Sequence, residues 1–193
     1  MGTRFGTKDS LLRLIAVAHA NGLEVYPDVV LNHTIGGQED PQALGDDKYK
    51  RFRYRGFGGP EEGRWPKDHW NFHPNPDHYC SWGDWCEQKF GPDNCFLDQE
   101  HGGGRNGKYM RDRAREWFVW LAKQTGADGF RFDAVKHFPA YVVEDLLYHA
   151  MGGRLDYFAV GEYVGGLQAM DTWTAHTRNR AGTFDFGLRD GLI

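Results

Sequence analysis

Hydrophobic residues open the chain at helical spacing, and a continuous apolar run follows them. The helical face consists of Leu11, Leu12, Leu14, Ile15 and Val17. Ser10 is the expected N-cap, and Asn21-Gly22 is the expected end of this helix. Residues 23–31 then form a β-branched apolar run, which is typical of a strand buried on both faces of a parallel sheet.

The second half of the chain alternates between helical and strand patterns. Helices are expected at 109–125 and 141–151 and strands at 130–135 and 157–161, with 182–187 as a further candidate strand. Strands that alternate with helices predict a parallel α/β architecture. Polar residues at the strand ends favour a (β/α)₈ TIM barrel over a doubly wound sheet.

Between these halves, residues 34–97 show no helical stripe and are rich in Gly, Pro, Asp, His and aromatic residues. Trp and Phe are too frequent here for a solvated linker, and long irregular segments within compact folds are usually functional. We interpret the segment as an inserted subdomain of short strands and loops. The expected organisation is a barrel segment at 1–33, the insertion at 34–97 and a second barrel segment at 98–193.

The amino-acid composition and the net charge limit what the protein can bind. Hydrophobic residues make up 40% and charged residues 26%, which excludes a disordered chain. The net charge is −4 with both signs interspersed, so the sequence predicts binding neither to nucleic acid nor to a membrane surface. No apolar run reaches the ~18 residues of a membrane span. Aromatic residues at 15% suit a surface that stacks flat, uncharged rings.

The three cysteines are Cys80, Cys86 and Cys95, an odd number within one short stretch. Four histidines lie nearby, namely His69, His73, His78 and His101. No pair has C-x-x-C spacing, so buried thiols or one disulfide are favoured over a structural zinc site, which stays the minor alternative.

Polar clusters lie where predicted strands end, which is where barrel enzymes carry their reactive groups. These clusters are at 28–33, 131–137 and 161–163. Arg131 and Asp133 are two apart on a strand and share a face, where the guanidinium would hold the carboxylate ionised and nucleophilic. A buried structural ion pair is the alternative.

Glu162 directly follows the apolar strand that ends at Gly161. A partly desolvated carboxyl in that position suits a general acid. An acid that merely starts a helix is the alternative, and a Gly-Glu pair alone would favour it. Asp28 and Asn32 are an even number of residues apart, so their side chains point to the same face of a strand. Taken alone, Asp28 is as well explained by a hydrogen-bonded structural role in the core as by a role in the site.

Three motifs carry a family resemblance: DVVLNH at 28–33, GFRFDAVKH at 129–137 and GEY at 161–163. In order and spacing they resemble three conserved regions of the α-amylase family of glycoside hydrolases. RFGT at 4–7 and FDFGLRDGL near the end are also similar to the family. The resemblance implies a (β/α)₈ barrel with a subdomain inserted after the third strand, of which this chain holds about strands 3 to 6.

The resemblance also implies roles for residues. Asp133 would be the nucleophile and Glu162 the acid/base, with Arg131 keeping Asp133 anionic. The remaining implied substrate-site residues are His33, Lys136 and His137 against glucosyl units, and Asp28 at the barrel mouth.

Calcium is the cofactor that the resemblance implies, between barrel and insertion. Asn32 would be one ligand and the backbone carbonyl of His137 another, and oxygen donors suit a hard cation. The family pattern of an apolar residue followed by Asp-x-Asp-His is replaced at 97–101 by LDQEH, which makes Asp98 the candidate carboxylate. If the family pattern is aligned two residues earlier, Phe96 takes the position of Asp98, and the candidate carboxylate is lost.

The implied activity is retaining endo-hydrolysis of α-1,4-glucans through a covalent intermediate. Ala134 and the pair at 136–137 resemble α-1,4-acting members, and the pair at 162–163 resembles the bacterial liquefying type. Two alternatives remain, an α-glucanotransferase and a non-catalytic glucan-binding fragment.

Both ends of the chain look cut, because barrel strands before the third and after about the sixth have no counterpart. The family's third catalytic carboxylate, an Asp that follows a His near the seventh strand, is likewise missing, and Asp185 is in the wrong place for it. The chain alone is therefore expected to be inactive. The complete enzyme is expected to be a monomer, and secretion is plausible because large glucans do not enter cells, although this chain has no signal peptide.

Overall fold

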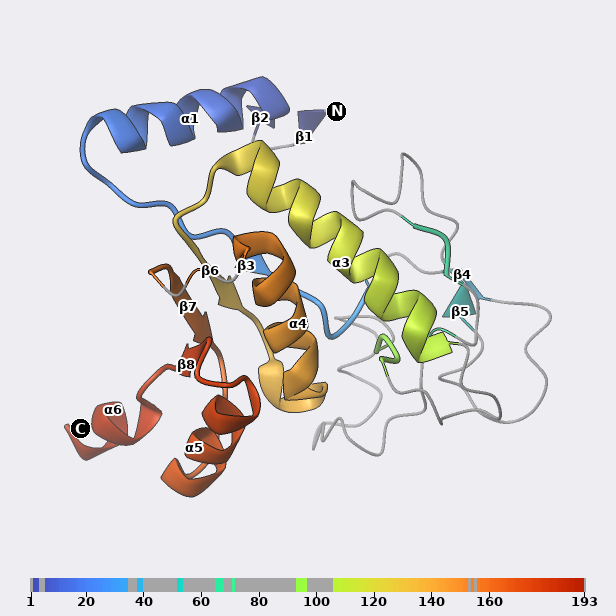
Figure 1. Cartoon of the computed structure of the whole chain (residues 1–193), viewed down its shortest axis with the longest axis vertical. Helices are drawn as coiled ribbons and strands as arrows, with labels where there is room; N and C mark the ends of the chain where they lie inside the picture. Colours follow the sequence, from blue (N-terminus) through green and yellow to red (C-terminus); the bar gives the residue numbers. More distant parts are fainter. Residues whose placement is uncertain are drawn as a thin grey trace.

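The computed structural model of the chain describes residues 2–3, 6–34, 38–39, 52–53, 65–67, 71, 93–96, 106–152, 154 and 156–192. Figure 1 shows them in colour along the whole chain. No helix among them is long and apolar enough to cross a membrane. Cys80, Cys86, Asp98 and most of the predicted insertion lie outside the described residues.

A four-stranded parallel sheet organises the described residues. Its strands, in spatial order, are β3 (Asp28–Val29), β6 (Gly129–Phe132), β7 (Phe158–Gly161) and β8 (Gly182–Thr183). The crossovers between them contain α3 (Asn106–Thr125), α4 (Ala140–Met151) and α5 (Leu167–His176). This confirms the parallel α/β architecture and is consistent with part of a (β/α) barrel, whereas the strand numbers and domain boundaries stay predictions.

Within the described residues, two antiparallel strand pairs lie outside this sheet. They are β1 (Gly2–Thr3) with β2 (Gly6–Thr7), and β4 (Gln38–Glu39) with β5 (Phe52–Arg53). The second pair belongs to the predicted insertion. It is too short to test the interpretation of that segment as a subdomain.

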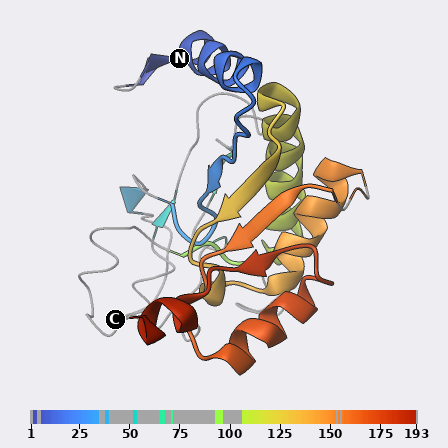
Figure 2. The ribbon, with the colours of Figure 1, turned by 90° about the vertical axis from the view of Figure 1, so that its left-hand side faces the viewer.

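The core lies between the sheet and its helices, and Figure 2 shows α3 and α4 on one side of the four strands. Phe118 of α3 places its ring 4.4 Å from that of Phe130 and 5.6 Å from that of Phe132. Leu146 and Leu147 of α4 are buried in the same cluster. Because side chains alternate along a strand, Arg131 points to the opposite face.

The first helix, α1 (Lys8–Ala20), has its N-cap three residues before the predicted cap, Ser10. Thr7 is the N-cap, and Ser10 is the N3 partner of a capping box: Ser10 N donates to Thr7 Oγ1 at 3.2 Å, and Thr7 N donates to Ser10 Oγ at 2.8 Å. Of the predicted apolar face only Ile15 is buried. The predicted strand at 23–31 is paired only at 28–29, where β6 offers a ladder partner.

The predicted strand ends at 135 and 187 were also wrong. β6 stops at Phe132 because Ala134 adopts a left-handed conformation (φ 51°, ψ 37°) and Val135–His137 forms a 3₁₀ turn. β8 stops at Thr183, and Asp185 then caps α6 (Phe186–Gly191) by accepting a 2.7 Å hydrogen bond from Leu188 N. Helix α5 was not predicted.

Candidate active site

The guanidinium of Arg131 contacts three carboxylates at the edge of the sheet. Arg131 Nη1 donates to both oxygens of Asp28, at 2.7 and 2.8 Å, and to Asp133 Oδ1 at 2.5 Å. Arg131 Nη2 lies 3.0 Å from Glu162 Oε2. Four residues that sequence reasoning singled out therefore meet in space.

The register of the parallel strands explains this meeting. Asp28 on β3 lies opposite Arg131 on β6. Asp133 and Glu162 are the first residues after β6 and β7, and Glu162 N donates to Phe132 O at 2.8 Å, so the two strand ends are level. Because parallel strands point the same way, residues that follow them gather at one edge.

The charges at this edge are only partly screened by water. The side chains of Arg131 and Asp133 are 24% exposed and that of Glu162 is 34% exposed. Burial opposes the charge of Arg131, but the hydrogen bonds to Asp28 and Asp133 outweigh it and raise the pKa of the guanidinium. Asp133 and Glu162 contact the same guanidinium, through Nη1 and Nη2 respectively, so the two carboxylates lie on the same side of the sheet edge.

Glu162 is also held by the turn that follows β6. Ala134 N donates to Glu162 Oε2 at 3.4 Å, and Val135 N donates to Glu162 O at 3.2 Å. The left-handed conformation of Ala134 aims these two N–H groups at β7. Alanine seldom adopts this conformation, so an alanine at position 134 does not predict a turn there.

Helix α5 packs directly under the acid. A Cβ added to Gly161 would lie 2.6 Å from Trp173 Cη2 and 2.8 Å from Val135 Cγ2, so this glycine allows the indole to reach β7. The ring of Tyr163 lies 6.4 Å from that of Trp173 and against Gly165. Sequence reasoning missed Trp173, because its partners are distant in sequence.

Two predicted substrate-site histidines lie near the carboxylates. Burial lowers the pKa of His33; the charge of Asp133 opposes this shift and His137 adds to it. His33 also forms an isolated β-bridge with Asp93. Lys136, the third residue predicted to contact substrate here, is exposed on the 3₁₀ turn.

The residues expected to bind calcium are partly described. Asn32 is buried, and its Nδ2 donates to Asp93 Oδ1 at 2.9 Å. Asn94 N donates to Asn32 O at 2.7 Å, which ties the two segments together. No group of three or more His, Cys, Asp or Glu within the described residues is arranged to hold a metal ion. The buried carboxylate of Asp93, which sequence reasoning missed, fits a hard cation beside Asn32.

Of the three cysteines only Cys95 is described. It is buried, and its N–H donates to Asn71 O at 2.8 Å. The predictions of a disulfide or a zinc site involve Cys80 and Cys86, and they lie outside the described residues.

Comparisons with a family model and with known proteins point to the same family. The family model described as "Alpha amylase, catalytic domain" matches residues 1–158. The chloroplastic alpha-amylase 3 of Arabidopsis thaliana is 26% identical, covering 96% of this chain and 20% of that protein. The alpha-amylase of Bacillus licheniformis is 27% identical, covering 96% of this chain and 42% of that protein. The chain thus spans less than half of these relatives.

Solved structures share the fold. The Anoxybacillus alpha-amylase superposes with a TM-score of 0.59 at 23% identity, covering 94% of this chain and 34% of that one. The Geobacillus thermoleovorans alpha-amylase, solved in complex with acarbose, gives a TM-score of 0.55 at 21% identity, covering 90% of this chain and 33% of that one.

Proposed function

This chain belongs to the alpha-amylase catalytic-domain family of glycoside hydrolases, and we propose that the protein carrying it cuts internal α-1,4 bonds of glucans with retention of configuration. The observation that supports this most is the contact of Arg131 with both Asp133 and Glu162. Retaining glycosidases use two carboxyl groups close together, about 5–5.5 Å apart, and a shared contact with one guanidinium brings this pair to the same place.

In the first step, an oxygen of Asp133 attacks the anomeric carbon. The bond from this carbon to the glycosidic oxygen breaks, and that oxygen keeps the electron pair and takes a proton from Glu162. Arg131 Nη1 donates to Asp133 Oδ1 and so orients the proposed nucleophile. Glu162 therefore enters this step carrying the proton that it gives to the leaving oxygen.

In the second step, Glu162 takes a proton from water, and the resulting nucleophile attacks the same anomeric carbon. Asp133 leaves as a carboxylate, so two inversions restore the original configuration. His33, Lys136 and His137 are proposed to contact the glucosyl units. Asp28 is proposed to brace Arg131 from the neighbouring strand.

We also propose that calcium binds at the junction near Asn32, with Asp93 as a carboxylate ligand beside the predicted Asp98 and the carbonyl of His137. The ion would stabilise the segment joined to β3. The buried Asn32–Asp93 contact supports the site.

The experiment is an assay of reducing sugar released from soluble starch by the complete protein. Asp133→Asn and Glu162→Gln should each lower kcat by about 10²- to 10⁴-fold. Asp156→Asn is a matched control, because that carboxylate is 73% exposed and pairs only with Arg154 among the described residues. Proton NMR of the first product should show the α-anomer.

Two results would contradict the proposal. Initial release of the β-anomer would exclude retention. Transfer of glucosyl units to other sugars in preference to water would identify a glucanotransferase, which uses the same covalent intermediate.

A further inference from the structure

A cavity of about 450 Å³ lies on the helix side of the sheet, between the 3₁₀ turn after β6, the start of α4 and one face of α5. Its floor is apolar, because Val135, Phe138 and Trp173 line it and are buried. Ala140 of α4 and Ala169 of α5 line its sides. The volume falls within the range of small-molecule sites, about 300–1,000 Å³.

The cavity is separate from the candidate active site. Consecutive residues of a strand point to opposite faces, so Gly161 and Glu162 at the end of β7 face different ways. Trp173 lies on the Gly161 face, where an added Cβ would be 2.6 Å from its Cη2. The carboxyl group of Glu162 lies on the other face with Arg131. A ligand in this cavity therefore does not occupy the place proposed for the reacting part of the substrate.

Two helix N-termini border the cavity, and neither has an acidic partner in its own first turn. Ala140 is the first residue of α4, and Gln168 and Ala169 belong to the first turn of α5. The N-cap residues, Pro139 and Gly166, have no side-chain oxygen, and neither first turn contains Asp or Glu. The first backbone N–H groups of a helix have no partner inside the helix and favour an anion.

The indole of Trp173 points to a ligand independently of the helix termini. Its side chain lines the cavity and is only 5% exposed, and its Nε1 has no hydrogen-bond partner among the described residues. A buried donor without an acceptor is costly, so folded proteins usually provide an acceptor. An oxygen atom of a ligand in the cavity would fill this role.

The charges around the cavity also favour an anion. In the part of the chain that the structure describes, no aspartate or glutamate lines it. Lys136 and His176 line it and are exposed. The ammonium of Lys136 and, when protonated, the imidazole of His176 add positive charge at the rim.

We propose that this cavity binds a small organic anion, whose apolar body lies on Val135, Phe138 and Trp173 and whose anionic group lies at the N-termini of α4 and α5. Trp173 Nε1 donates to an oxygen of that group. The ligand belongs to a different chemical class from a glucan, and the inference does not depend on the proposed hydrolysis.

The probe for the test is 3-phenylpropanoate, which joins one carboxylate to an apolar ring. Calorimetric titration into the complete protein should show saturable binding. The neutral analogue 3-phenylpropanamide should bind about ten-fold more weakly, because it lacks the charge that the helix termini favour. Inorganic phosphate should also bind about ten-fold more weakly, because it has no apolar body to cover the floor.

Two variants test the contacts separately. Gln168→Glu places a carboxylate in the first turn of α5 and should weaken binding of 3-phenylpropanoate about three- to ten-fold, while the helix itself gains stability. Ala175→Glu is the matched control, since Ala175 is exposed on the same helix and does not line the cavity. Trp173→Phe keeps an aromatic ring but removes the N–H, and it should weaken binding about ten-fold. Trp117→Phe on α3, away from the cavity, should have no effect.

Four results would overturn the inference. They are the absence of saturable binding of 3-phenylpropanoate, equal affinity for 3-phenylpropanamide or for phosphate, and unchanged affinity in the Gln168→Glu or the Trp173→Phe protein. The fourth is competition between 3-phenylpropanoate and maltoheptaose, which would place the probe in the candidate active site.

Discussion

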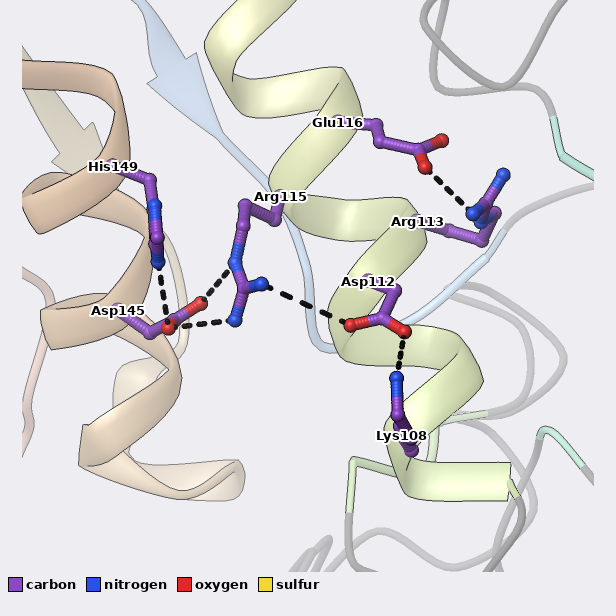
Figure 3. Close-up of polar contacts among 7 residues, drawn as sticks. All are labelled: Lys108, Asp112, Arg113, Arg115, Glu116, Asp145 and His149. Carbon is purple, nitrogen blue, oxygen red and sulfur yellow. Dashed lines mark hydrogen bonds and ion pairs between the residues drawn. The ribbon is translucent and has the colours of Figure 1, made fainter.

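Arg115 of α3 and Asp145 of α4 are joined by two hydrogen bonds, from Nε to Oδ2 at 3.0 Å and from Nη2 to Oδ1 at 2.8 Å. Figure 3 shows this pair between the two helices, with His149 Nε2 3.5 Å from Asp145 Oδ1. The paired geometry fixes orientation as well as distance. It therefore locks together the two helices that cover the sheet below the candidate active site.

Asp145→Asn should lower the free energy of unfolding by about 1 kcal/mol, because the pair is partly exposed yet doubly hydrogen-bonded. Urea denaturation at neutral pH measures this. Glu116→Gln is the matched control, since Glu116 pairs with Arg113 within α3 alone and its loss should cost at most about 0.5 kcal/mol. Equal effects of the two substitutions would show that the contact between helices adds nothing.

Gly161→Ala should destabilise the protein by about 1–3 kcal/mol and lower kcat, because the new methyl group would overlap Trp173 and Val135 beneath Glu162. Thermal unfolding and starch hydrolysis check the two effects. Trp173→Leu in the same protein should restore part of the stability by making room.

The control for that prediction is Gly182→Ala on the neighbouring strand, where a Cβ would meet no atom within 4 Å. This substitution should be tolerated. A Gly161→Ala protein as stable and active as the Gly182→Ala protein would contradict the packing argument.

The pH dependence of stability should include a contribution from Asp128. The hydrogen bond from Val25 N–H, at 2.8 Å, lowers the pKa of this carboxyl against the effect of burial, and the ring of His19 at 2.9 Å lowers it further. A lowered folded-state pKa stabilises the protein above the unfolded value of about 3.9, and this stability is lost as the pH falls through the folded value.

The difference in unfolding free energy between wild type and Asp128→Asn should therefore shrink as the pH falls below about 4. Chemical denaturation across this range measures it. A difference that is independent of pH would show that the charge of Asp128 is not what ties residue 25 to the start of β6.

Calcium should raise the melting temperature of the complete protein, and a chelator should reverse the effect. An ion that binds only the folded state adds about 2.7 kcal/mol at about a hundred times its Kd. Asp93→Asn should reduce the shift, because it removes the buried carboxylate beside Asn32. If calcium shifts the melting temperature of this variant as much as that of the wild type, Asp93 is not a ligand.

Local patterns in the sequence were enough to predict part of this arrangement. The apolar faces of α3 and α4 repeat within single helices, so their periodicity revealed them. Arg131 and Asp133 share a face by strand parity, and Glu162 ends a short apolar strand, so each was identifiable from its neighbours in sequence. Their meeting at one sheet edge follows from the rule that parallel strands share a direction.

Other features depend on contacts between distant residues, and only the tertiary structure decided them. Trp173 reaches Gly161 from another element, and Asp93 reaches Asn32 across 61 residues. The left-handed turn at Ala134 exists because its N–H groups bond to Glu162. Propensity and periodicity describe a residue and its near neighbours, whereas these contacts depend on how the sheet and its helices pack, which no local pattern contains.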